Sequence, residues 1–142
     1  DLGSGGGFPA LPLAIALKGT GHHFVLVEPT SRKVSFLRTV VRELNLAVTV
    51  ESRRSEQLDS RETPVPDVIT SRALAALPVL CRWMAPFFGP QTRAVLHKGR
   101  EHVEEVAEAA THWDFDVIVN QSNTDRSGVL LTLRNLRAKT GS

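Results

Sequence analysis

The chain contains very little cysteine, and this scarcity removes several classes of site. Its one cysteine, Cys81, has no partner within the 142 residues and no Cys or His at metal-ligand spacing, so neither a disulfide framework nor a structural zinc site is expected. The five histidines also lack the spacing of metal ligands, and we expect no metal. Because Cys81 lies within an apolar helical pattern, we expect it in the core rather than as a nucleophile.

Long apolar runs are missing as well. No stretch approaches the ~20 residues needed to span a bilayer. No charged segment followed by an apolar one marks a signal peptide. The charge is nearly balanced, with 17 Lys and Arg against 15 Asp and Glu, and this modest basicity permits a polyanionic partner without demanding one. We therefore expect a cytoplasmic protein without membrane association.

The chain does contain an alternation of strands and helices. Strands are predicted at 23–28, 47–51, 66–73, 93–99, 115–121 and 129–136, and helices at 9–18, 31–44, 75–84 and 101–113. Such alternation is typical of right-handed βαβ units and a mostly parallel sheet. Only seven residues join the last two strands, so we expect these to form an antiparallel hairpin at one sheet edge. The length fits one domain, residues 1–142.

A glycine-rich loop, DLGSGGGFP, opens the chain between the end of a first strand and a helix. We expect the rest of that strand, the central one of such a sheet, to lie upstream of the sequence. Glycines here let the backbone approach a nucleotide-like cofactor and adopt positive φ. The triplet Gly5, Gly7 and Ala10 fits the dinucleotide fingerprint GxGxxA. Glu28, at the next strand end, is placed to accept both ribose hydroxyls, so a dinucleotide remains an alternative.

Two residues favour S-adenosylmethionine over a dinucleotide. Pro9 removes a backbone N–H at the helix start, where a pyrophosphate needs donors. Asp1, a carboxylate at the tip of the first strand, would repel phosphates but suits an ammonium or a sulfonium. The pattern Asp-x-Gly-x-Gly-x-Gly over residues 1–7 matches the first motif of Rossmann-like methyltransferases, and the terminal hairpin fits that class.

Five segments resemble one family in order and spacing, across nearly the whole chain. They are DLGSGGGFPALPLAI, EPTSRKVSFLRTVVRELNL, SRRSEQL, DVITSRALAAL and LHKGRE. The sequence is similar to the bacterial 16S ribosomal RNA guanine-N7 methyltransferases, formerly called glucose-inhibited division protein B. The resemblance implies a Rossmann-like α/β methyltransferase fold with a mostly parallel seven-stranded sheet and an antiparallel C-terminal hairpin. It also implies that the family's N-terminal helical region and the start of its first strand are absent here.

The resemblance further implies a set of cofactor-binding residues for S-adenosylmethionine. In chain order they are Asp1, Gly3, Gly5, Phe8, Glu28, Ser55, Glu56 and Arg72. Glu28 is expected to hold the ribose, Ser55 and Glu56 to lie at the adenine edge, and Arg72 to reach the methionine end or the substrate. Phe8 as a plain core residue and Glu56 as a solvated carboxylate at a helix start remain alternative interpretations.

The reaction implied is methyl transfer to N7 of guanosine 527, in the 530 loop of 16S ribosomal RNA. Because N7 carries an exposed lone pair, no general base is needed and positioning dominates. The Asn-Pro-Pro-aromatic segment associated with methylation of exocyclic amines is absent. Arg72 and Lys98, at the carboxyl ends of strands, are the candidate catalytic residues. Lys98 and Arg100 are expected to contact guanine O6 or N7, or phosphate.

A basic helix face is a second candidate for contact with RNA. Arg32, Lys33, Arg38 and Arg42 lie outside the apolar stripe of the helix at 31–44, where they can meet phosphates or form a solvated surface. The partner implied is 16S ribosomal RNA or the small ribosomal subunit, bound by a monomer. A nicotinamide-dependent oxidoreductase and a non-catalytic module are the alternative functions.

Overall fold

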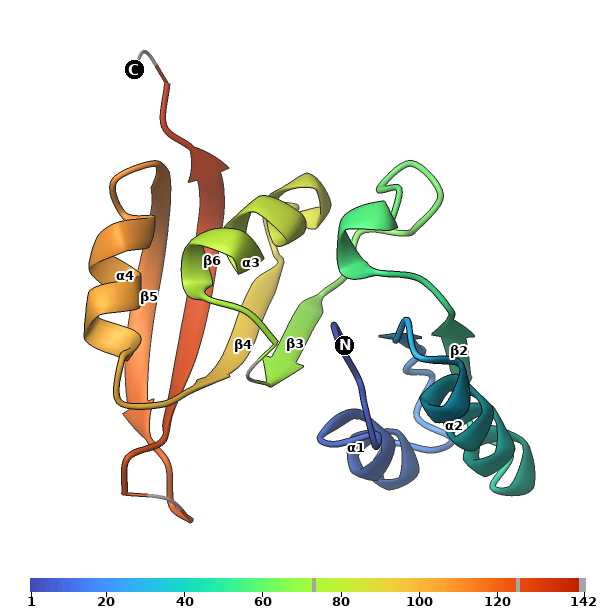
Figure 1. Ribbon diagram of the computed structural model, residues 1–142. Helices are drawn as coiled ribbons and strands as arrows, with labels where there is room; N and C mark the ends of the chain where they lie inside the picture. The colour runs from blue at the N-terminus through green and yellow to red at the C-terminus, as the bar shows by residue number, and fades with distance from the viewer. Residues whose placement is uncertain (73, 125, 141–142) are drawn as a thin grey trace. The chain divides into compact units, whose positions relative to one another are not determined.

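The computed structural model describes residues 1–72, 74–124 and 126–140, which form two compact units (Figure 1). Unit 1 comprises residues 1–58 and 70–72, and the other described residues form unit 2. The expectation of a single domain over the whole chain remains a prediction. Within the described ranges, no helix has both the length and the apolar character needed to cross a membrane.

Unit 1 begins with the glycine-rich loop and continues in alternating helices and strands. Its elements are α1 (Ala10–Ala16), β1 (Phe24–Val27), α2 (Ser31–Glu43), β2 (Val48–Glu51) and the 3₁₀ turn η1 (Ser55–Gln57). Strands β1 and β2 pair in parallel, with Phe24 opposite Val48. Leu2 makes parallel bridges to Val27 on one side and to Ser71 on the other. The first residues of the chain therefore lie between two strand ends, as expected for the end of a central strand.

The core of unit 1 is formed where α1 and α2 pack against β1 and β2. Its buried members are Ala10, Leu11, Ala14, Leu26, Val34, Leu37, Leu46 and Val50. The spacing of three residues between Val34 and Leu37 places both on the inner side of α2, so that the opposite side is left to solvent. This packing fixes the start of α2 next to the end of β1.

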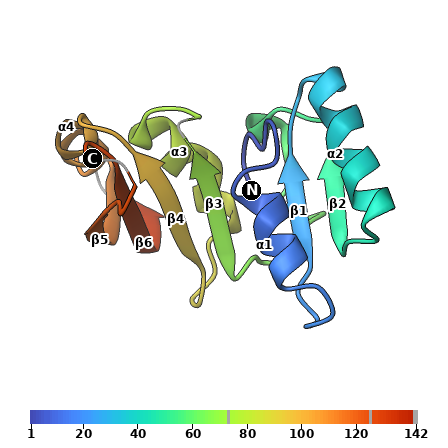
Figure 2. The same ribbon diagram turned by 90° about the horizontal axis from the view of Figure 1, so that it is seen from below.

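Unit 2 contains a four-stranded sheet in the order β3-β4-β6-β5. Its elements are β3 (Val68–Arg72, of which the last three residues belong to unit 1), α3 (Leu77–Met84), η2 (Ala85–Phe87), β4 (Arg93–Lys98), α4 (His102–Ala109), β5 (Trp113–Gln121) and β6 (Val129–Ala138). Strand β6 is antiparallel to both β4 and β5. Helices α3 and α4 lie side by side on one face of β4, β6 and β5 (Figures 1 and 2).

The fold differs from the expected sheet in its number of strands. The antiparallel terminal hairpin is confirmed by the pairing of β5 with β6. The prediction of a mostly parallel seven-stranded sheet is wrong. The described residues form a parallel pair of strands and a mixed four-stranded sheet. The end of the first strand appears only as the two bridges of Leu2. Ala73, the last residue of the strand expected at 66–73, lies outside the described residues.

The predicted helix at 101–113 is also too long. Helix α4 ends at Ala109, and Trp113 already opens β5. The alternation of Trp113, Phe115 and Val117 with two aspartates has the period of a strand, and it extends the strand backwards into the expected helix. A turn in which the His112 amide donates to the Ala109 carbonyl oxygen at 3.2 Å separates the two elements.

Candidate functional site

The glycine-rich loop of unit 1 combines three residues in the left-handed region. Gly3, Gly5 and Gly7 have φ values of +66°, +53° and +96°. A Cβ on Gly7 would lie 2.4 Å from Leu11 Cδ1, so this glycine is required both by its φ and by the packing of α1. A Cβ on Gly6 would meet nothing within 4 Å. The loop is therefore tightly packed at Gly7 and open at Gly6.

Glu28, next to the end of β1, is hydrogen-bonded to this loop. Its side chain is 4% exposed, its Oε1 accepts a hydrogen bond from the Gly5 amide at 2.8 Å, and its Oε2 accepts one from the Thr30 amide at 2.9 Å. Burial raises the pKa of Glu28, but the amides of Thr30 and Gly5, the Thr30 hydroxyl and the charge of Lys33 outweigh it, so the pKa lies below its usual value. The carboxylate is thus held ionised beside the glycine loop.

Asp1, at the start of the glycine-rich loop, carries a second carboxylate. Its Oδ1 accepts a hydrogen bond from the Thr70 hydroxyl at 2.6 Å, which ties it to the end of β3. Asp1 Oδ2 and Ser71 Oγ are both buried and have no hydrogen-bond partner within the described part of the chain. Because an unsatisfied buried polar atom is costly, these two atoms are the strongest candidates for contact with a bound ligand.

The other predicted cofactor residues also belong to unit 1, but the structure places them differently from one another. Ser55 is buried at the start of η1, while Glu56 beside it is exposed. Arg72 is exposed at the carboxyl end of β3. Phe8 is 61% exposed, which does not fit the alternative of a plain core residue. The hydrogen bonds bring together Asp1, the glycine loop and Glu28; the roles of the other residues stay predictions.

Lys98 occupies a different environment from the one expected of a substrate-contacting residue. Its side chain is 5% exposed, and its Nζ donates to the Ala75 carbonyl oxygen at 2.5 Å and lies 2.9 Å from Glu105 Oε1. Glu105 Oε1 also accepts from the Leu77 amide at 2.7 Å. This buried pair joins β4, α4 and the start of α3, so its geometry favours a positioning role for Lys98. Arg100 is exposed just beyond β4.

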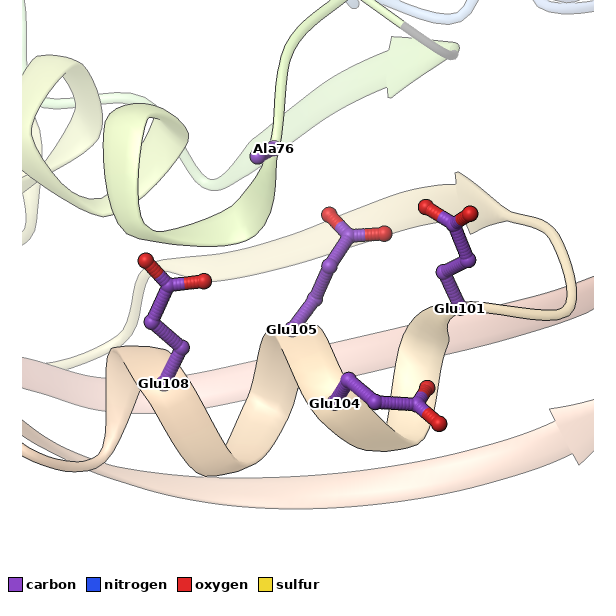
Figure 3. Close-up of a pocket in the computed structure, with 5 residues that line it drawn as sticks. All are labelled: Ala76, Glu101, Glu104, Glu105 and Glu108. Atoms are coloured by element: carbon purple, nitrogen blue, oxygen red, sulfur yellow. The ribbon is translucent and has the colours of Figure 1, made fainter.

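The pocket beside this pair carries the wrong charge for a polyanion. It is lined by Ala76 and four glutamates, Glu101, Glu104, Glu105 and Glu108. Figure 3 shows three of these carboxylates on the side of α4 toward Ala76, with Glu104 turned away from it. Carboxylates at this density repel phosphates, so this part of unit 2 is a poor surface for RNA.

Cys81 is fully buried in α3, as the sequence predicted. Burial raises the pKa of its thiol to about 12. A thiol with so high a pKa supplies almost no thiolate near neutral pH, and the thiolate is the nucleophilic form. Cys81 therefore serves packing.

Sequence reasoning missed several groups that complete these contacts. Thr30 and Thr70 were not singled out, and Ser71 entered only as part of the segment DVITSRALAAL and not as a site residue. Thr70 and Ser71 lie near the carboxyl end of β3, a place where ligand-facing residues gather. Glu105 was missed as well, because nothing in its spacing distinguishes it from the three exposed acidic residues near it in the chain, Glu101, Glu104 and Glu108.

The glycine loop, its carboxylates and the α/β framework can be compared with known proteins. The GidB family model, described as rRNA small subunit methyltransferase G, matches residues 1–129. The chain belongs to this family. The family predicted from the sequence is thus confirmed. The dinucleotide alternative, already weakened by Asp1 and Pro9, finds no support in it.

A curated relative and two solved structures illustrate the similarity. The chain is 42% identical over 139 residues to the ribosomal RNA small subunit methyltransferase G of Bartonella tribocorum, covering 97% of this chain and 65% of that protein. The chain thus spans just under two thirds of that relative's length. A putative rRNA-methylase from Clostridium thermocellum is 12% identical, with a TM-score of 0.70 over 100% of this chain and 86% of that one. The fibrillarin/Nop5p complex gives 14% identity and a TM-score of 0.74 over 94% and 69%. Both structures share the α/β fold of this chain.

Proposed function

We propose that the protein transfers the methyl group of S-adenosylmethionine to N7 of a guanosine in 16S ribosomal RNA. The observation that carries this proposal is the family match over residues 1–129, which spans the glycine loop, Glu28 and Asp1. The proposed partner is 16S ribosomal RNA or the small ribosomal subunit, bound by a monomer in the cytoplasm. The guanosine of the 530 loop named above is the proposed target.

The chemistry of unit 1 fits S-adenosylmethionine. Asp1 Oδ2, which has no hydrogen-bond partner among the described residues, offers a buried acceptor for an ammonium group, and the buried Ser71 Oγ likewise has no partner there. Each oxygen of Glu28 accepts one amide, and a carboxylate has about four acceptor positions, so Glu28 retains acceptor capacity for a ribose hydroxyl beyond its contacts with Gly5 and Thr30. A pyrophosphate would instead place its charge next to the Asp1 carboxylate. These hydrogen-bond acceptors and their negative charge therefore favour a cationic ligand over a dinucleotide.

When bound, S-adenosylmethionine supplies a methyl group activated by its sulfonium centre. The residues of the chain bind the cofactor and the guanosine and orient them toward each other. Asp1 binds the ammonium group, Glu28 holds the ribose, and Arg72, exposed at the end of β3, contacts guanine O6 or a phosphate. No group is needed to remove a proton, because N7 attacks with its own lone pair. Rate acceleration then comes from alignment of the acceptor.

A methyl-transfer assay tests this function directly. The chain is mixed with methyl-labelled S-adenosylmethionine and with 16S ribosomal RNA or small subunits that lack N7 methylation. We expect label in the RNA and strand cleavage at one guanosine after borohydride and aniline treatment. Glu43→Gln, an exposed residue of α2, should keep full activity. Cofactor binding without transfer to either RNA substrate would contradict the proposal and favour the non-catalytic module.

A further inference from the structure

Helix α2 exposes an aromatic ring among positive charges. Phe36 is 51% exposed on the side opposite to buried Val34 and Leu37. Arg32 and Lys33 precede it by four and three residues and are exposed too. Side chains at these separations are neighbours on a helix surface. Arg32, Lys33 and Phe36, called here the α2 face, therefore form one continuous surface.

The stability of the helix does not account for this composition. The first turn of α2 contains no acidic residue, although it holds Arg32 and Lys33. Cations near the start of a helix are disfavoured by its dipole, by about 0.3–1 kcal/mol each at exposed positions. A half-exposed phenylalanine also forgoes part of the gain from apolar burial. The two cations thus lower the stability of α2 and Phe36 contributes less than a buried ring would, so this composition requires another explanation.

The α2 face begins beside the proposed cofactor residues. The Thr30 carbonyl oxygen accepts the Val34 amide at 2.9 Å in the first turn of α2, while the Thr30 amide donates to Glu28. Lys33 is close enough for its charge to act on the Glu28 carboxylate. A polymer bound across the α2 face would therefore pass within reach of the loop where methyl transfer is proposed.

We propose that the α2 face binds an unpaired segment of the substrate RNA, with one base stacked on Phe36 and the adjoining phosphates paired with Arg32 and Lys33. The inference rests on the function proposed above. Stacking on an exposed ring combined with phosphate neutralisation is the usual mode of single-strand binding. Duplex RNA buries its base faces and cannot use Phe36 in this way.

Charge complementarity is what favours RNA over a protein partner here. On the surface of α2, Phe36 is bordered by two cations, Arg32 and Lys33, and by the hydroxyl residue Thr39, three residues further on. A protein docking on α2 would have to desolvate these cations to cover a single ring, which is costly without matching carboxylates. An RNA strand supplies a base face and phosphates at the spacing of one nucleotide.

Binding of a labelled, unstructured single-stranded RNA oligonucleotide tests the proposal by fluorescence anisotropy. We expect Phe36→Ala to weaken binding roughly 5- to 100-fold, since stacking of one base contributes on that order. Phe36→Trp should bind at least as well as the parent chain. Leu44→Ala, which removes another exposed apolar side chain at the end of the same helix, is the matched control and should not change binding. Arg32→Ala should lower the salt dependence by about 0.7 in logarithmic slope.

The outcomes separate this inference from the proposed function. Calorimetric titration with S-adenosylmethionine should give the same affinity for Phe36→Ala and the parent chain. If the parent chain methylates RNA and Phe36→Ala binds the oligonucleotide as tightly as the parent, the inference is overturned while the function stands. Full affinity in Phe36→Leu would also overturn it, because an apolar contact rather than stacking would then suffice. A parent chain that binds the cofactor but no RNA would refute both.

Discussion

At the scale of single residues, Glu28 can be tested before any ligand is added. Glutamine at this position keeps the size of the side chain but has only one oxygen, and its NH₂ group would face one of the two amides that the carboxylate now accepts. We expect Glu28→Gln to lower the free energy of unfolding by about 1.5–3 kcal/mol, the range for hydrogen bonds to a charged group. Urea denaturation measures the change, with exposed Glu43→Gln as the control. Equal midpoints for the two variants would show that Glu28 does not fasten the loop.

The same residue predicts a pH dependence. The folded-state pKa of Glu28 is depressed relative to about 4.3 for an unfolded glutamate. Its ionised form therefore stabilises the fold fully above about pH 4.3, and this contribution is lost as the pH falls through the lower folded-state pKa. We expect the stability difference between the parent chain and Glu28→Gln to be constant near neutral pH and to shrink below about pH 4.3. Urea denaturation at a series of pH values checks this. A stability difference that grows on acidification would contradict the prediction, because it would mean that folding raises the pKa of Glu28.

Two adjacent glycines of the loop provide a matched pair. Alanine at Gly7 would combine a φ of +96° with a methyl group 2.4 Å from Leu11, whereas alanine at Gly6 would meet open space. We expect Gly7→Ala to cost at least about 1–2 kcal/mol of unfolding free energy, from backbone strain alone, and Gly6→Ala to stay within about 0.5 kcal/mol. Thermal or urea unfolding distinguishes them. Similar losses in both would mean that flexibility, rather than packing and φ, sets the glycine requirement.

At the scale of elements, the pair formed by Lys98 and Glu105 joins β4, α4 and the start of α3. From the sequence we expect Lys98 to contact guanine or phosphate, so that Lys98→Ala would weaken turnover while the affinity for the cofactor stays near that of the parent chain. The buried pair predicts instead a loss of stability of about 3–5 kcal/mol for Lys98→Met, because Glu105 would keep a buried charge without its partner. Urea denaturation measures this loss.

A double-mutant cycle tests whether the two side chains act as a pair. Lys98→Met combined with Glu105→Gln should be less destabilised than the sum of the two single variants, since the second change removes the stranded charge. Strict additivity would mean that the ion pair contributes nothing and that Lys98 acts through its hydrogen bond to the Ala75 carbonyl oxygen alone. If Lys98→Met is as stable as the parent chain but has lost methyl transfer, Lys98 acts as a catalytic residue.

At the scale of the whole molecule, ligand binding should stabilise the folded chain. At 100 times its dissociation constant, a ligand specific for the folded state adds about 2.7 kcal/mol. For a chain of this length we expect S-adenosylmethionine to raise the melting temperature on the order of 5–10 °C. NADH at the same concentration is the control and should give no shift. A shift with NADH alone would overturn the assignment of the glycine loop.

The helices, the strands and the family could be predicted from the sequence, because each is indicated by residues that lie close together in the chain or at fixed spacing. Alternation, helical periodicity and glycine spacing act over a few residues, and they predicted every described α-helix and strand to within a few positions except the end of α4, but not the short 3₁₀ helices η1 and η2. That boundary failed because a period-two pattern at Trp113–Val117 competed with the helical one. Residue types at fixed spacing, such as the loop over residues 1–7, also pointed to the methyltransferase family that the comparison confirmed.

Only the tertiary structure decided which polar groups meet. Asp1 and Thr70 are 69 residues apart in the chain and Lys98 and Ala75 are 23 apart, so their hydrogen bonds depend on strand order and helix packing rather than on any local pattern. For the same reason the sequence could not tell that Lys98 is buried. The sequence by itself determined the types of element and the glycine-rich loop, since these depend on short-range sterics and periodicity. Burial and pairing of charges were decided by long-range packing.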